Sequence, residues 1–100
     1  MKKITEESIN AFLNRTKFKK QNMEVSLNNY NDETHLELHG NTIAILNEFN
    51  ELFITNCGWF SNTTKERLNA LPNVCIYQKN WVWYLNEKEW NGKLTQVLIK

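Results

Sequence analysis

Glycine is scarce in this sequence. Only Gly40, Gly58 and Gly92 occur in 100 residues, and each stands alone. A phosphate-binding loop of the P-loop or dinucleotide type needs several glycines in one short turn, so these nucleotide sites are excluded. The GxSxG and HExxH motifs of hydrolases and zinc proteases are also missing. Because no catalytic motif is present, we expect a protein that binds rather than an enzyme, and we expect no cofactor.

Cysteine is scarce too, since Cys57 and Cys75 are the only residues of this type. Without a CxxC spacing or further cysteines, neither a zinc ribbon nor a disulfide framework is predicted, and two free thiols are expected in a reducing cytosol. Cys57 lies just ahead of a predicted helix N-terminus, where a thiolate nucleophile is favoured. No histidine lies near it in the sequence, however, and Asn56-Cys57-Gly58 is equally typical of a turn.

Long apolar runs are missing as well. No segment is long enough to span a membrane, and Met1-Lys2-Lys3-Ile4 leads into Thr5-Glu6-Glu7 rather than into the apolar part of a signal peptide. The chain is therefore expected to act in the cytoplasm, without a membrane partner. With 41% apolar and 23% charged residues, 100 residues are predicted to form one globular domain over 1–100.

Neither charge sign is in excess overall, but the charges are divided along the chain. Residues 1–20 hold six basic and two acidic residues, a net +4; residues 21–60 hold no Lys or Arg and six acids, a net −6; residues 61–100 hold six basic and three acidic residues, a net +3. A strong nucleic-acid binder is usually clearly basic, and a DNA mimic would be strongly acidic. The composition favours neither extreme and is compatible with faces of opposite sign.

Hydrophobic periodicity predicts an α+β domain with an antiparallel sheet of about five to seven strands, a meander followed by a C-terminal hairpin. A helix is predicted over 6–17, capped by Thr5 and ending in the basic cluster Arg15, Lys17, Lys19 and Lys20. A short helix is predicted after a Thr63–Glu66 capping box and stops at Pro72. Strands are predicted at 23–27, 35–39, 43–45, 52–54, 74–77, 81–85 and 94–99, with turns at Lys79-Asn80 and Asn86-Glu87 and a hairpin at Asn91-Gly92.

His35, Glu37 and His39 resemble a set of metal ligands. On one face of a strand, however, the two histidines would lie about 13 Å apart. Zinc–nitrogen bonds are about 2 Å long, so one ion cannot be reached easily by both. We interpret the three residues as a solvated strand face and predict no metal site.

Four residues of the segment 61–67 could hold an anion: Thr63, Thr64, Lys65 and Arg67. Free backbone amides at a helix start, hydroxyl groups and two cationic side chains suit a phosphate or a carboxylate. Helix capping with solvated charges explains the same residues, so both interpretations stay open.

The C-terminal third is rich in aromatic residues, namely Tyr77, Trp81, Trp83, Tyr84 and Trp90. In a strand over 81–85 both faces would be apolar or aromatic. One face is expected to be core, and the other is either covered by the N-terminal helix or exposed for docking. Because a chain this short has little structure to cover both faces, we predict that at least one of the three tryptophans is an exposed binding anchor.

Several stretches resemble a group of small proteins encoded by tailed phages, for which no catalytic residues are established. The resemblance is carried by 38–44, 58–60, 63–71, 83–86 and 89–92. In that group a glycine often follows the asparagine at position 86, where this sequence has Glu87. The resemblance implies a host-takeover or anti-defence factor, a class that includes anti-CRISPR proteins.

The resemblance and the missing catalytic motifs together predict a phage-encoded protein that inhibits a host defence complex, such as a CRISPR effector, by occlusion. Its acidic residues would meet a nucleic-acid-binding groove of the host protein: Glu24, Asp32, Glu33, Glu37, Glu48 and Glu51. The alternative is a small nucleic-acid-binding module that combines the aromatic hairpin with Lys17, Lys19, Lys20, Lys65 and Arg67. A monomer or a small homo-oligomer is expected in either case.

Overall fold

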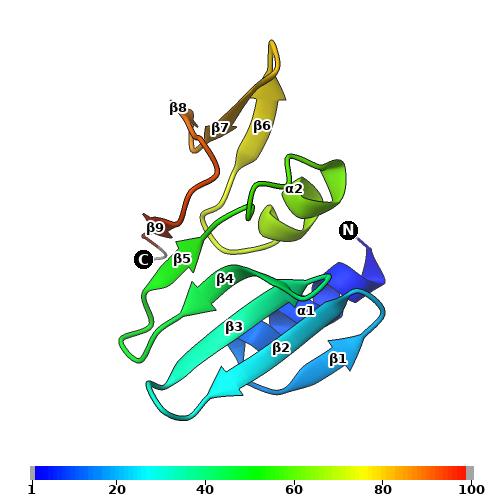
Figure 1. Cartoon of the computed structure of the whole chain (residues 1–100), viewed down its shortest axis with the longest axis vertical. Helices are drawn as coiled ribbons and strands as arrows, with labels where there is room; N and C mark the ends of the chain where they lie inside the picture. Colours follow the sequence, from blue (N-terminus) through cyan, green and yellow to red (C-terminus); the bar gives the residue numbers. More distant parts are fainter. Residues whose placement is uncertain (1, 99–100) are drawn as a thin grey trace.

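The computed structural model describes residues 2–98 and shows two helices and two antiparallel sheets (Figure 1). In chain order the elements are α1 (Lys3–Leu13), β1 (Phe18–Lys20), β2 (Met23–Asn28), β3 (Glu33–Leu38), β4 (Asn41–Leu46), β5 (Leu52–Ile54), α2 (Asn62–Leu68), β6 (Ile76–Lys79), β7 (Val82–Leu85), β8 (Lys88–Glu89) and β9 (Thr95–Val97). The larger sheet has the strand order β1-β2-β3-β4-β5-β9, and the smaller one has the order β6-β7-β8. The predicted α+β class is confirmed.

Helix α1 packs against β1, β2 and β3, and Figure 1 shows it behind these strands. Its buried side chains include Ile9 and Phe12, which recur on one side of the helix. The helix begins three residues before the predicted start. Lys2 is the N-cap and makes no side-chain capping bond, whereas Thr5 lies inside the first turn and is fully buried. The prediction that Thr5 caps this helix is therefore wrong.

The C-terminal end of α1 also differs from the predicted range. Arg15 adopts the left-handed conformation, with φ of 53°. Its N–H donates to Phe12 O at 3.1 Å, and the Thr16 N–H donates to Ala11 O at 2.8 Å. This pair of bonds is the Schellman arrangement that closes a helix. The helix thus ends at Leu13, and the predicted basic cluster instead leads into β1, an edge strand that the periodicity did not reveal.

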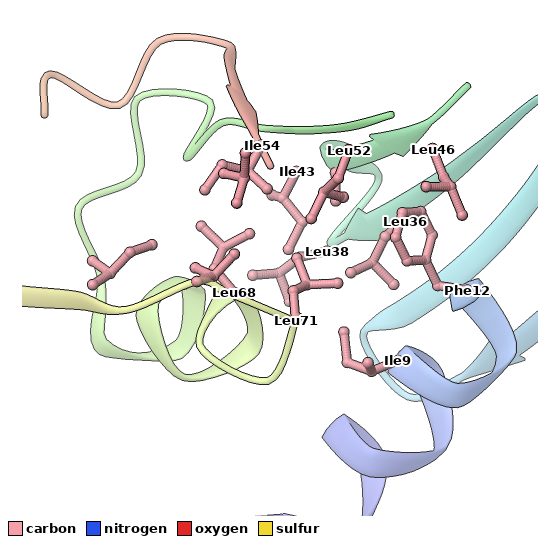
Figure 2. Close-up of a cluster of buried hydrophobic side chains, with 14 of the residues drawn as sticks. Ile9, Phe12, Leu36, Leu38, Ile43, Leu46, Leu52, Ile54, Leu68 and Leu71 are labelled. Carbon is pink, nitrogen blue, oxygen red and sulfur yellow. The ribbon is translucent and has the colours of Figure 1, made fainter. Parts of the chain in front are cut away.

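The strands of the larger sheet alternate between two faces. Met23 and Val25 lie opposite Leu38 and Leu36, and all four are buried on the face that α1 covers. A register shift between β3 and β4 accompanies the burial of two consecutive β4 residues. Figure 2 shows the resulting core, where apolar residues of the sheet face those of both helices: Ile9, Phe12, Leu36, Leu38, Ile43, Leu46, Leu52, Ile54, Leu68 and Leu71.

Helix α2 lies between the two sheets (Figure 1). Ser61 is its N-cap, and the Ser61 Oγ accepts a hydrogen bond from the Thr64 N–H at 3.1 Å. The predicted capping box of Thr63 and Glu66 is therefore wrong. Two consecutive threonines after Ser61 made the true start ambiguous. The helix ends at Leu68, before Pro72 is reached.

The predicted hairpin at Asn91-Gly92 is also wrong. After β8 the chain leaves the smaller sheet and returns to the larger one, where β9 pairs with β5. Gly92 has φ of 85°, and a Cβ there would collide with the buried Asn56 amide. The Gly92 carbonyl accepts bonds from the Asn56 N–H at 3.0 Å and from Thr55 Oγ1 at 2.7 Å. Glycine is therefore required for this close crossing. The end of the predicted last strand, Ile99, lies outside the described residues.

Candidate functional site

The turn between β6 and β7 consists of Asn80 and Trp81, with φ of 52° and 69°. Two positive φ values in a two-residue loop define a type I′ turn, in which glycine is the favoured second residue. Trp81 occupies that position and is 92% exposed. A bulky residue with positive φ is a conformational outlier. The protein therefore displays its most exposed tryptophan at a position where the backbone disfavours it.

The smaller sheet has two different faces. Ile76, Trp83 and Leu85 are buried on the inner face. On the outer face Tyr77 and Tyr84 lie directly opposite each other, and their rings stack with centroids 5.2 Å apart. Figure 1 shows α1 at the far end of the molecule, behind β1–β3. The option that the N-terminal helix covers this second face is therefore wrong.

Trp83 and Trp90 are structural. Trp83 is 2% exposed; the Phe60 ring meets it edge-on at 5.0 Å, and the Lys65 Nζ lies 5.6 Å from its ring centroid. Trp90 is also buried, and its Nε1 donates to Thr95 Oγ1 at 2.9 Å. Since neither ring belongs to an exposed surface, only Trp81 of the three predicted anchors is placed to contact a partner.

Three of the predicted acidic residues share the open face of the larger sheet, the face opposite α1. Glu24 and Glu37 are directly opposite each other in the β2–β3 register. Ser26 Oγ donates to Glu37 Oε2 at 2.8 Å, and Glu33 Oε1 lies 3.0 Å from the His35 Nε2. Like charges directly opposite each other destabilise an antiparallel pair. The open face therefore holds an acidic pair, with Lys19 of β1 opposite Glu24 on the other side.

The remaining acidic residues lie elsewhere. Asp32 and Glu48 line a groove of about 530 Å³ at one end of the larger sheet, together with Glu33 and Arg15. Glu51 belongs to the β4–β5 loop and accepts a hydrogen bond from Asn47 Nδ2 at 2.8 Å. The structure thus divides the six predicted acids between the open face and the sheet end.

Arg15, which the sequence predicts only as part of a basic cluster at the end of a helix, organises this end of the sheet. Its Nη1 donates to Asp32 O, Thr34 Oγ1 and Leu46 O, and its Nη2 donates to Asn47 O and Asn50 Oδ1. The guanidinium therefore ties the end of α1 to the β2–β3 and β4–β5 loops. These partners are 17–35 residues away in sequence, and no local signal announces them.

The four residues predicted to hold an anion do not share one surface. Arg67 is 3% exposed and donates to Thr5 Oγ1 at 2.8 Å, to Asn22 Oδ1 at 3.3 Å and to Glu66 Oε1. Thr64 is buried in the helix cap. Burial alone would raise the pKa of Glu66, but hydrogen bonds from Thr5 and Arg67 and the Arg67 charge outweigh it and hold the pKa below its ordinary value. Arg67 thus serves the junction of α1 and α2.

The other candidate residues, His35 and Cys57, make local contacts on β3 and β4. His35 lies between Glu33 and Thr42, with its Nδ1 at 3.4 Å from Thr42 Oγ1. Within residues 2–98 no group of three or more His, Cys, Asp or Glu side chains could hold a metal ion. The Cys57 thiol donates to Thr42 O at 2.8 Å, and burial raises its pKa, which disfavours the thiolate.

A family model described as Kyanoviridae Gp96 protein matches residues 1–96. The chain belongs to this family. No curated protein and no solved structure matches it. The resemblance to phage proteins is confirmed at this level. In the described part of this Gp96 family member, no helix has the length and apolar character needed to cross a membrane.

One departure from the phage group, Glu87 in place of glycine, has a clear structural outcome in this Gp96 family member. Asn86 and Glu87 have φ of 50° and 71° and connect β7 to β8 as a second type I′ turn. The Asn86 side chain secures this turn, because its Oδ1 accepts from the Cys75 N–H at 2.9 Å and its Nδ2 donates to Asn73 O at 2.9 Å. The turn therefore forms without glycine.

Proposed function

We propose that this Gp96 family member is a non-catalytic phage protein that inhibits a host defence protein by covering one of its surfaces. The observation that carries the proposal is Trp81, a tryptophan 92% exposed at the tip of a hairpin in a disfavoured backbone conformation. Strain of this kind is typical of functional positions, and tryptophan is the residue type most enriched among binding anchors. A partner pocket that receives the indole would account for both features.

The open sheet face supports a partner of positive charge. Glu24 and Glu37 repel each other across the β2–β3 pair, and Glu33 adds a third carboxylate to the same face. Lysine or arginine side chains of a partner would remove this repulsion and steer the encounter. Protein surfaces rich in lysine and arginine are typical of nucleic-acid-binding proteins. We therefore place the partner among host nucleic-acid-binding defence proteins, with a CRISPR effector complex as the specific candidate.

The experiment expresses the protein in cells with an active CRISPR system and measures phage plating, alongside a pull-down from the same lysate. The proposal expects restored plating and co-purification of an effector subunit. Trp81→Gly is expected to lose both effects, because glycine suits the turn but removes the anchor. Tyr30→Ala is the matched control, since Tyr30 is an aromatic residue 99% exposed in another loop. A panel of defence systems in which plating never changes would overturn the proposal.

Two basic residues of the nucleic-acid-binding alternative make contacts within the fold. Arg67 is buried against Thr5 and Glu66, and Lys65 lies over the Trp83 ring. Fluorescence polarisation with labelled DNA and RNA at about 50 mM salt distinguishes the two functions, because phosphate contacts are strong at low salt. We expect no binding of bare nucleic acid through phosphate contacts, and binding that falls steeply with added salt would favour the alternative.

A further inference from the structure

A pocket of about 330 Å³ lies apart from the hairpin tip and from the open sheet face. It is bounded by the β3–β4 turn, by the loop that precedes α2 and by the first turn of α2. Leu38 and Ile43 line it with apolar side chains, and Trp59 stands beside them with 61% of its surface exposed. Its volume lies at the lower end of the roughly 300–1,000 Å³ typical of small-molecule sites.

The loop that carries Trp59 is held by several hydrogen bonds. Asn56 accepts from the Gly58 N–H at its Oδ1 and from the Trp59 N–H at its carbonyl, both at 2.8 Å. The Cys57 thiol donates a hydrogen bond from its Sγ to Thr42 O of β4 at 2.8 Å. Asn56 itself is buried and anchored to Gly92. The backbone of the loop that carries Trp59 is therefore positioned by the fold before any ligand arrives, which lowers the entropic cost of binding.

Three polar side chains at the pocket retain hydrogen-bonding capacity. Within the described chain the Thr63 hydroxyl and the His39 ring make no hydrogen bond, and the Asn41 amide makes only a long one of 3.5 Å to His39 O. By contrast, Ser61 and Thr64, which also line the pocket, are engaged in the helix cap. No Asp, Glu, Lys or Arg lines the pocket. The pocket thus combines an apolar floor, an aromatic wall and a polar rim that contains no Asp, Glu, Lys or Arg.

We propose that this pocket binds the base of a nucleoside. The flat ring would stack on the Trp59 indole, and its polar edge would pair with the Asn41 amide and the Thr63 hydroxyl. Aromatic side chains stack well on every base, and an asparagine amide offers the donor and acceptor that match a base edge such as that of adenine. Because no cationic side chain lines the pocket, it recognises the base and leaves any phosphate outside. This inference is independent of the proposed inhibition of a host protein.

The test follows the four tryptophan indole N–H signals of the full-length ¹⁵N-labelled protein by NMR, assigned with single Trp→Phe variants. Adenosine, guanosine, cytidine and thymidine are added to about 10 mM, enough to saturate a site with a dissociation constant of about 1 mM. The Trp59 signal is expected to shift saturably with at least one nucleoside, and the Trp81 signal is expected to stay in place. A short single-stranded oligonucleotide is tested in the same way. Tighter binding of the oligonucleotide than of the nucleosides would identify a base within a nucleic acid as the natural ligand, and weaker binding would identify a free nucleoside.

Two variants test the geometry, and their melting temperatures show that each still folds. Trp59→Ala is expected to weaken binding about tenfold or more, since it removes the stacking surface. Thr63→Val keeps the side-chain shape without the hydroxyl and is expected to weaken binding several-fold, whereas Trp81→Gly should bind as the parent protein does. The proposal is overturned if no nucleoside shifts Trp59, if either pocket variant binds unchanged, or if indole and phenol bind more tightly than every nucleoside. That last result would assign the pocket to an aromatic side chain of a partner protein.

Discussion

Arg15 and Trp81 both occupy backbone positions where glycine is the usual residue, but for opposite reasons. Arg15 closes α1 with φ of 53°. Its guanidinium makes five hydrogen bonds to the β2–β3 and β4–β5 loops and to the neighbouring ends of β3 and β4. Trp81 closes a hairpin with φ of 69°, and its side chain is 92% exposed. The left-handed conformation costs about 1–2 kcal/mol for a residue with a Cβ. At Arg15 the side chain offsets this cost through its hydrogen bonds, whereas the exposed Trp81 side chain makes no hydrogen bond within residues 2–98 that would offset it.

Trp81→Gly should therefore stabilise the protein. Relief of the backbone strain is expected to raise the free energy of unfolding by up to about 1 kcal/mol, or the melting temperature by about 4–8 °C. Thermal melts followed by circular dichroism measure this change. Trp83→Ala is the contrasting variant, and its buried ring should cost about 3–5 kcal/mol. If Trp81→Gly melts well below the parent protein, Trp81 has a structural role and the argument from strain fails.

Arg15 should respond in the opposite direction. Arg15→Ala keeps the strained backbone and removes the guanidinium, so we expect a loss of about 2–3 kcal/mol in urea unfolding. Arg15→Gly relieves the strain and should recover about 1 kcal/mol of this loss. Arg15→Lys keeps the charge but not the forked donors, and should resemble Arg15→Ala. A lysine variant as stable as the parent would show that charge alone holds this end of the sheet.

At the scale of elements, local pattern predicted some parts of the fold well. The strand β2 and most of β3 lie where apolar and polar residues alternate, because each has one face on the core. The strand β5 is a short apolar run, Leu52-Phe53-Ile54, next to a turn. The edge strand β1 was missed since Phe18, Lys19 and Lys20 show no such alternation. Both helix starts were misplaced. Before α2 several Ser and Thr residues compete as caps, whereas α1 starts after Lys2 without any side-chain cap, so the capping pattern pointed to Thr5 instead.

The candidate sites, like the elements, could be predicted from the sequence only in part. The exposure of one tryptophan could be inferred from the number of aromatic residues, but which one could not, because Trp81 entered a turn rather than a strand. The roles of Arg15 and Arg67 depend on partners up to 62 residues away. The Trp59 pocket likewise joins a hairpin turn to a helix start. Contacts of this kind follow from the tertiary fold and leave no local trace in the sequence.

The junction of α1 and α2 should make stability depend on pH. Because the pKa of Glu66 is lower in the folded protein, its carboxylate contributes stability above its ordinary pKa of 4.5, and this contribution is lost as the pH falls through the lower folded value. Denaturant melts at several pH values below about 4.5 should show this loss. Glu66→Gln should be less stable at pH 7 and depend less on pH in that window. The control is Glu87→Gln, which removes an exposed carboxylate from the β7–β8 turn. If this variant reduces the pH dependence of stability as much as Glu66→Gln does, Glu66 is not its cause.

At the scale of the whole molecule, the order of charges along the chain becomes a division in space. The segment without Lys or Arg supplies β2 to β5, the middle of the larger sheet, while β1 adds Lys19 opposite Glu24 at one edge. Lys20 points to the helix side, where its Nζ lies 3.1 Å from Glu7 Oε1. The open face therefore carries three of the six acidic residues of this segment.

Glu37→Gln should separate the contribution of this charge to binding from its effect on stability. Glutamine can still accept the Ser26 hydrogen bond, but the repulsion with Glu24 disappears, so we expect a gain of about 0.2–1 kcal/mol in the free energy of unfolding. Adding Glu24→Gln should give no second gain, because only one repelling pair exists and Glu24 also loses its attraction to Lys19.

The same substitution should slow association with a basic partner, because electrostatic steering acts mainly on the association rate. Surface plasmon resonance with the partner recovered by pull-down, at about 50 and 500 mM salt, should show a smaller salt dependence for Glu37→Gln than for the parent protein. Glu87→Gln removes the same charge from the β7–β8 turn of the smaller sheet, away from the open face, and should leave the association rate closer to that of the parent. If both variants slow association equally, net charge rather than the open face attracts the partner. If Glu37→Gln binds at the parent rate at both salt concentrations, the acidic face takes no part in recognition, and the hairpin tip must act without it.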